Sequence, residues 1–198
     1  MKKILAIILL LCVTVLSLAS CSENNSANET SYTVDCVLKI PPRFYSADEL
    51  YAAISRSDPA LPESVREMRK LYYPEIVIEG YAIGVIEVFD YSIQYHIVPE
   101  EFKDNWLEAP AGSKSILTVS FTSHQTVAEL EKFLTGLNQG KITVLDESTV
   151  LRQAAYAREV YFIFDGIVCS VSLHDSYYGQ ITAQSIVKMH YRNIPVTK

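Results

Sequence analysis

The chain has 198 residues, enough for one domain of ordinary size or two small ones. Charged residues make up 20% of it and apolar residues 49%, which excludes a disordered or collagen-like chain. The net charge of −6, from 17 basic and 23 acidic side chains, excludes a general nucleic-acid-binding protein, because such proteins need a basic face.

The first twenty residues have the pattern of an export signal. Lys2 and Lys3 precede ten consecutive apolar residues, 4–13, a run that is too short to span a bilayer core of about 30 Å but is typical of a signal peptide. The run leads to Leu-Ala-Ser-Cys at 18–21. This motif resembles the lipobox of bacterial lipoproteins, in which an apolar residue and two small residues precede an acylated cysteine. We therefore expect residues 1–20 to be a lipoprotein signal peptide.

The lipobox resemblance implies an anchor and a location. It implies that Cys21 carries acyl chains and becomes the new N-terminus, which holds the protein at the outer face of the bacterial cell membrane. The alternatives are an ordinary signal peptide with a chance cysteine and a plain transmembrane anchor. Cleavage removes Lys2 and Lys3, so 15 basic and 23 acidic residues remain, a net charge of −8. Anionic lipid heads repel such a domain, so the acyl chains are expected to hold it.

The mature chain is expected to have two parts. Residues 21–31 comprise the lipidated cysteine and a polar segment without bulky apolar residues, which reads as a flexible tether with a reach of roughly 15–20 Å. Residues 32–198 are expected to form a single domain.

The first half of this domain mixes strand and helix signals. Residues 32–40 alternate between apolar and polar, as in a half-buried strand, and Pro41 and Pro42 end the pattern. Ser46 and Glu49 form a capping box, which predicts a helix to about residue 56. The remaining elements expected here are a helix from about Pro62 to before Pro74 carrying Val65, Met68 and Leu71, strands over about 81–89 and 91–98, and a surface loop over 99–115 with the single Trp106.

The second half contains a clear helix signal and a clear hairpin signal. Thr126 and Glu129 form another capping box, opening a helix that Gly140 is expected to end. Asp165-Gly166 between two apolar runs is the strongest hairpin signal in the chain. The other elements expected are strands over 116–123, 141–145, 160–164 and 167–173, an ambiguous segment over 148–157, and a closing helix over 181–192 with Ile186, Val187 and either His190 or Met189 inward.

This order predicts an α+β fold. Neighbouring strands join through short turns, so the sheet is expected to be mainly antiparallel, with helices packed on one face. The segments Phe44-Tyr45-Ser46 and Phe121-Thr122-Ser123 each precede a capped helix. Two β-α-β-β halves would explain the similarity of these two segments, and the common chemistry of helix capping explains it equally.

Two cysteines remain after the signal and the lipidation site are set aside. Cys36 and Cys169 lie outside the cytoplasm in this interpretation, so a disulfide between them is one alternative. Two buried free thiols that act as small apolar side chains are the other.

The sequence carries no catalytic, metal-binding or phosphate-binding motif of a known kind, and we expect no cofactor. A metal site built from His96, His174 and Asp175 would require strands to bring them together. The 13 tyrosines are about twice the usual rate, and exposed tyrosines with carboxylates suit recognition surfaces, although tyrosine also suits half-exposed strands. The candidate ligand surface consists of Tyr177, Tyr178, His174 and Asp175.

The domain also shows a looser resemblance, to small lipoproteins of Gram-positive bacteria. The resemblance rests on Ser46, Glu49 and Leu50, on the Leu-Tyr-x-Pro step at 71–74, and on the Phe-Asp-Gly hairpin at 164–166. It supports the fold and implies no activity and no catalytic residue.

Our leading hypothesis is a non-enzymatic lipoprotein whose domain binds a partner protein or a cell-envelope ligand such as a glycan. One alternative is an envelope hydrolase with a non-standard site around His174, Asp175 and Tyr177. Another is a transporter-associated binding lipoprotein, for which the mature chain is small.

Overall fold

The computed structural model describes residues 40–120, 126–137, 140–153, 157–174 and 187–195. The chain divides into two compact units, Met1–Ile40 and Pro41–Lys198, and all of the described helices and strands belong to the second. The strand expected over 32–40 lies outside the described residues except for Ile40, which belongs to no strand.

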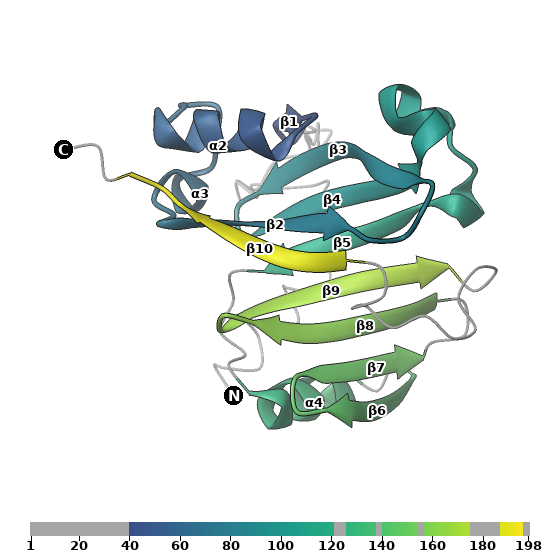
Figure 1. The fold of residues 1–198 in the computed structure, drawn as a ribbon. Coiled ribbons are helices and arrows are strands. Elements are labelled where there is room, and N and C mark those ends of the chain that lie inside the picture. Colours follow the sequence, from purple (N-terminus) through teal and green to yellow (C-terminus); the bar gives the residue numbers. More distant parts are fainter. Residues whose placement is uncertain (1–39, 121–125, 138–139, 154–156, 175–186, 196–198) are drawn as a thin grey trace, which may run out of the picture. The chain divides into compact units, whose positions relative to one another are not determined.

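The second unit contains an eight-stranded sheet and a two-stranded sheet (Figure 1). The order in the large sheet is β1-β3-β4-β5-β9-β8-β7-β6, and β10 pairs with β2 in the small one. Every pairing is antiparallel, so the expected α+β fold with a mainly antiparallel sheet is confirmed.
The strands are β1 (Arg43–Phe44), β2 (Lys70–Ile76), β3 (Tyr81–Phe89), β4 (Ser92–Pro99), β5 (Ser115–Ser120), β6 (Lys141–Asp146), β7 (Thr149–Gln153), β8 (Ala157–Phe164), β9 (Ile167–His174) and β10 (Val187–Asn193). The helices are α2 (Ala47–Ser55), α3 (Glu63–Arg66), α4 (Val127–Gly136) and two 3-10 segments, η1 (Glu100–Glu108) and η2 (Ala111–Ser113).

Both capped helices form where the sequence predicts them. The Ser46 hydroxyl accepts a hydrogen bond from the backbone N–H of Glu49 at 3.2 Å, and Thr126 does the same for Glu129 at 3.2 Å. These bonds satisfy backbone donors that a helix N-terminus otherwise leaves free. The helix that begins after Thr126 ends at Gly136, earlier than the predicted Gly140.

The hairpin predicted at Asp165-Gly166 is confirmed, and the strands predicted over about 81–89 and 91–98 pair as a second hairpin. Strands β3 and β4 turn at 90–91, and β8 and β9 turn at Asp165-Gly166. The φ angles of Asp165 and Gly166 are 51° and 76°, as a two-residue turn of the type favoured in hairpins requires. The ambiguous segment 148–157 contains β7.

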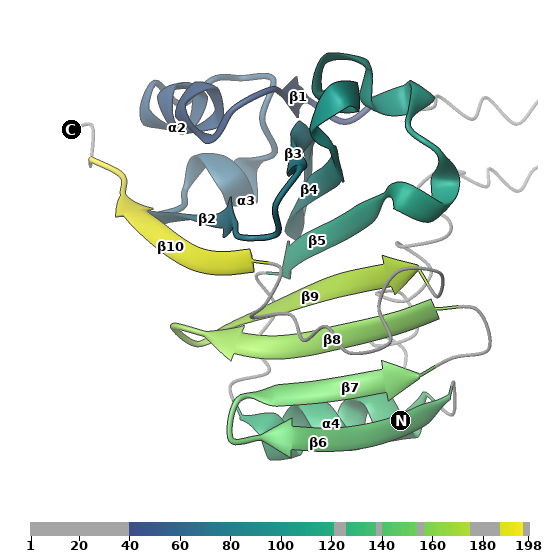
Figure 2. The ribbon, with the colours of Figure 1, turned by 45° about the vertical axis from the view of Figure 1, so that its right-hand side comes forward.

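Helices lie on both faces of the large sheet, which differs from the one-sided packing expected. Cys169 and Val171 of β9 belong to the main core, to which α2 and α3 contribute. Val168, which directly precedes Cys169, packs with Leu130 and Leu134 of α4. Because alternate residues of a strand point to opposite faces, α4 covers the face opposite α2 and α3 (Figure 2).

Two segments predicted as helix are strands, and they pair with each other. Helix α3 ends at Arg66, and the segment before and through Pro74 forms β2. The described part of the predicted closing helix forms β10, and residues 181–186 lie outside the described residues. Val187 faces Ile76 and Asn193 faces Lys70 in this ribbon.

The pairing explains both errors. Each strand of a two-stranded ribbon is an edge, so Pro74 is tolerated although it cannot donate a backbone hydrogen bond. Val187 and Met189 are buried while Lys188 between them is exposed, a period of two that suits a strand. The segment over 99–115 was expected to be a surface loop, and most of it forms η1 and η2.

Candidate binding site

Of the four residues expected at a ligand surface, His174 alone lies in the described part of the chain. Asp175, Tyr177 and Tyr178 lie outside the described residues, as do Cys21 and Cys36. His174 is the last residue of β9 and faces Ala157 of β8.

Cys169 lies buried in the middle of β9 and forms no disulfide with a described residue. Burial raises the pKa of this thiol to about 12, so it stays protonated and unreactive at neutral pH. The disulfide with Cys36 stays a prediction, because that residue lies outside the described part of the chain.

The described tyrosines differ in their exposure. Tyr91 lies exposed in the turn between β3 and β4, whereas Tyr95 of β4 is fully buried. Its hydroxyl donates to the backbone oxygen of Tyr72 at 2.6 Å. Tyr95 is therefore a core residue, and among the described tyrosines the exposed ones are Tyr45, Tyr91 and Tyr191.

His96 belongs to a buried polar cluster rather than to a metal site. Its Nε2 donates to the Glu87 carboxylate at 3.0 Å, and Arg43 donates to the other carboxylate oxygen at 2.9 Å. Trp106 of η1 covers the cluster, with its ring 4.9 Å from the His96 ring. Among the described residues, no group of three or more His, Cys, Asp or Glu side chains could hold a metal ion.

The Glu87 cluster fixes η1 against the sheet. The hydrogen bond from His96, supported by the one from Arg43, lowers the pKa of Glu87, whereas burial opposes this shift. The three side chains satisfy one another, which leaves the buried carboxylate paired and hydrogen-bonded. This cluster therefore stabilises the packing of Trp106 and η1 on β3 and β4.

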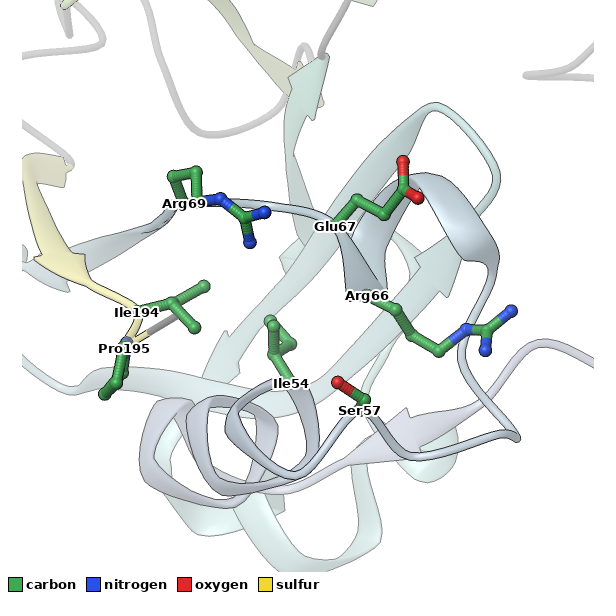
Figure 3. Close-up of a pocket in the computed structure, with 7 residues that line it drawn as sticks. All are labelled: Ile54, Ser57, Arg66, Glu67, Arg69, Ile194 and Pro195. Atoms are coloured by element: carbon green, nitrogen blue, oxygen red, sulfur yellow. The ribbon is translucent and has the colours of Figure 1, made fainter. Parts of the chain in front are cut away.

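A cavity lies where α2, α3 and β10 end (Figure 3). Its volume is about 190 Å³. The residues that line it are Ile54, Ser57, Arg66, Glu67, Arg69, Ile194 and Pro195.

The end of α2 positions Ser57 at this cavity. The N–H of Ser57 donates to the Ile54 carbonyl at 2.9 Å, and the N–H of Asp58 donates to the Ala53 carbonyl at 3.0 Å. This pair of bonds is the Schellman arrangement, which needs a left-handed residue after the helix. Ser57 supplies it with a φ of 53°, a conformation that costs a side-chain-bearing residue roughly 1–2 kcal/mol.

The far end of the chain closes the other side of the cavity. The N–H of Ile194 donates to the Arg69 carbonyl at 2.9 Å, continuing the contact between β10 and the segment that leads into β2. The Tyr51 hydroxyl of α2 donates to the Asn193 carbonyl at 3.1 Å. These bonds hold Arg69 and Ile194 beside the buried Ile54, although more than 100 residues separate them in the sequence.

The cavity has an excess of positive charge. The lining contains two arginines, Arg66 and Arg69, and one carboxylate, that of Glu67. Within the part of the chain that the structure describes, neither arginine forms an ion pair. The Nε atom of Arg66 is buried and has no hydrogen-bond partner among the described residues. Figure 3 shows the Arg69 guanidinium group pointing into the hollow, while that of Arg66 points away from Ile54.

One wrong element prediction explains why the sequence did not reveal the cavity. The arginines lie in a segment predicted as helix, which would have placed Arg66 and Arg69 on one helical face rather than at a helix end and in a loop.

The Glu87 cluster, in contrast, could have been suspected from the sequence, because Glu87 is the one charged residue within the apolar run of β3.

Comparison of the chain with models of protein families, with curated proteins and with solved structures found no match. Within the described ranges, no helix has the length and apolar character needed to cross a membrane.

Proposed function

We propose that this protein is a lipid-anchored lipoprotein whose domain binds a ligand of the cell envelope at the outer face of the bacterial membrane. The domain holds the ligand at the cavity between α2, α3 and β10 and performs no chemistry on it. The single observation that carries the binding role is the cavity with two arginines that lack carboxylate partners among the described residues.

The anchor rests on the sequence of the first twenty-one residues. The Lys2-Lys3 pair, the apolar run over 4–13 and the small residues before Cys21 together support cleavage after Ser20 and acylation of Cys21. Two or more acyl chains give stable membrane attachment, whereas a single chain gives marginal binding. The acidic domain then stands off the membrane on the tether of residues 21–31.

The binding role rests on unsatisfied polar groups. The Arg69 guanidinium group points into the hollow and forms no ion pair with a described residue, so it is suited to an anionic group of a ligand. Ser57 keeps a strained backbone at the same cavity. The hydrolase alternative depends on residues around His174, Asp175 and Tyr177, and the last two lie outside the described residues. The transporter alternative is less well supported, because the mature chain is small for a binding lipoprotein of that kind.

The fold itself supports two related halves. β1, α2, β3 and β4 follow one another with α3 and β2 inserted, and β5, α4, β6 and β7 repeat the order strand, helix, strand, strand. Each helix begins at a hydroxyl cap, Ser46 or Thr126, followed three residues later by Glu. The proposal is that these two β-α-β-β units arose from one pattern.

Membrane attachment is tested by Cys21→Ala in the full-length protein. The native protein should take up radiolabelled palmitate and sediment with membranes, and the variant should take up no label. A variant that is still labelled and processed like the native protein would overturn the anchor.

Ligand binding is tested in intact cells with a photo-crosslinking amino acid placed at Glu67, an exposed residue of the cavity lining. The matched control places it at the exposed Val144 on β6, at the opposite end of the large sheet. An adduct of defined mass should form at Glu67 and not at Val144. Equal adducts at both positions, or none at either, would overturn the binding role of the cavity.

A further inference from the structure

We propose that the cavity between α2, α3 and β10 recognises a free carboxylate with a short apolar group beside it, as at the C-terminus of a peptide. This inference rests on the proposed function and names the chemical class of its ligand. It assigns Arg69 as the residue that binds the carboxylate, and Ile54, Ile194 and Pro195 as the surface that the apolar group contacts.

The position of Arg69 suits a carboxylate. Its guanidinium group points into the hollow, as Figure 3 shows, and it forms no ion pair within the described part of the chain. A guanidinium group presents two parallel N–H donors, which match the two oxygens of a carboxylate. The Ile194 N–H holds the backbone of Arg69 at 2.9 Å, so the side chain starts from a fixed position.

The charges of the lining favour a single negative charge. Arg66 and Arg69 contribute two positive charges and Glu67 one negative charge, which leaves one positive charge. A carboxylate neutralises it. A phosphate dianion would add a second negative charge close to Glu67, and like charges in one site repel each other.

Size and surface also limit the ligand. The volume of about 190 Å³ lies below the range of roughly 300–1,000 Å³ that is usual for sites of drug-sized ligands. It suits one carboxylate and a side chain of a few carbon atoms. Ile54, Ile194 and Pro195 line this space, and the exposed Pro195 gives a short apolar group a surface to contact.

The test measures binding of N-acetylvaline and of N-acetylvalinamide to the full mature protein, extracted from membranes in a mild detergent, by ligand-observed NMR titration. The two probes have the same apolar side chain, and only the first carries a carboxylate. The acid should bind and the amide should not. Inorganic phosphate serves as a second anion and should bind more weakly than the acid.

Two variants and a control locate the binding. Arg69→Gln should weaken binding of N-acetylvaline about tenfold or more, because a hydrogen-bonded charge pair is lost. Glu67→Gln should strengthen it about twofold to fivefold, because a repulsive charge is removed. Lys188→Gln, which removes a positive charge from an exposed position on β10, should leave it unchanged.

The outcomes separate this inference from the proposed function. Equal binding of acid and amide, stronger binding of phosphate than of the acid, or an Arg69→Gln variant that binds like the native protein would each overturn the carboxylate assignment. A photo-crosslinked adduct at Glu67 would then still support the binding role of the cavity. The absence of that adduct overturns the binding role itself.

Discussion

The Asp165 carboxylate accepts hydrogen bonds from two residues of β2. Its Oδ2 atom lies 2.5 Å from the Lys70 ammonium group and 3.0 Å from the Tyr72 hydroxyl. Asp165 lies at the tip of the β8–β9 hairpin, whereas Lys70 and Tyr72 lie in the small sheet. One oxygen atom therefore joins the large sheet to the ribbon of β2 and β10. The Lys70 ammonium group also lies 4.5 Å from the centre of the Tyr191 ring of β10.

Tyr72→Phe removes one of these bonds and keeps the ring that packs edge-on against Phe164. We expect the free energy of unfolding to fall by about 1 kcal/mol, measured by urea denaturation. Tyr45→Phe is the control, because this tyrosine is exposed and its hydroxyl makes no hydrogen bond with a described residue. Equal stabilities of the two variants would show that the Asp165 contact does not hold the sheets together.

Gly84→Ala should displace η1. A Cβ atom at Gly84 would lie 2.6 Å from the Cβ of Trp106 and 3.0 Å from a methyl group of Val98, closer than side chains tolerate. We expect a loss of about 1–3 kcal/mol in the free energy of unfolding and a shift in tryptophan fluorescence, since Trp106 is the single tryptophan.

Gly136→Ala is the matched control for this glycine. A Cβ atom at Gly136 meets nothing within 4 Å, and the residue ends α4. We expect the substitution to be neutral or to stabilise the protein by up to about 1 kcal/mol. A Gly84→Ala variant as stable as Gly136→Ala would contradict the close packing of η1 on β3.

The Glu87 cluster should make the protein sensitive to acid. The hydrogen bond from His96 lowers the pKa of Glu87, so the unfolded chain takes up a proton here at a higher pH than the folded protein does. The stabilisation is complete above the ordinary pKa of glutamate, and it is lost as the pH falls through the lowered pKa of the folded state.

Thermal unfolding followed between pH 3 and 7 tests this dependence. Glu87→Gln should lower the melting temperature at neutral pH and reduce the further loss on acidification. Glu131→Gln, on the exposed face of α4, should keep the acid dependence of the native protein. The cluster would have no part in acid sensitivity if Glu87→Gln left the pH profile unaltered.

Ser57→Gly should stabilise the protein. The φ of 53° is unfavourable for serine and accessible to glycine, so relief of the strain should add about 0.5–1 kcal/mol to the free energy of unfolding. Ser57→Ala removes the same hydroxyl but keeps a Cβ atom, and it should give no such gain. Chemical denaturation of both variants separates the backbone effect from the loss of the hydroxyl, and equal stabilities would argue against strain at this position.

Helix caps and tight turns could be predicted from the sequence, because residues that are close together in the chain determine them. The caps at Ser46 and Thr126 need only the Glu three residues later, and the turn at Asp165-Gly166 needs only two residues that tolerate positive φ. The candidate site could not be predicted in this way. Arg69 directly precedes β2, and Ile194 directly follows β10. These two strands pair although more than 100 residues separate them, and no local sequence pattern predicts this pairing.

The capped helices, the Asp165-Gly166 hairpin and the antiparallel α+β class follow from the sequence, because capping bonds and tight turns form among a few neighbouring residues. The strand conformation of β2 and β10 depends on tertiary contacts. Apolar and aromatic residues over 70–76 and 187–193 fit a short helix and a strand equally well, and the backbone hydrogen bonds between the two segments decide in favour of strands. The same pairing creates the cavity, since it brings Ile194 to Arg69 beside the end of α2.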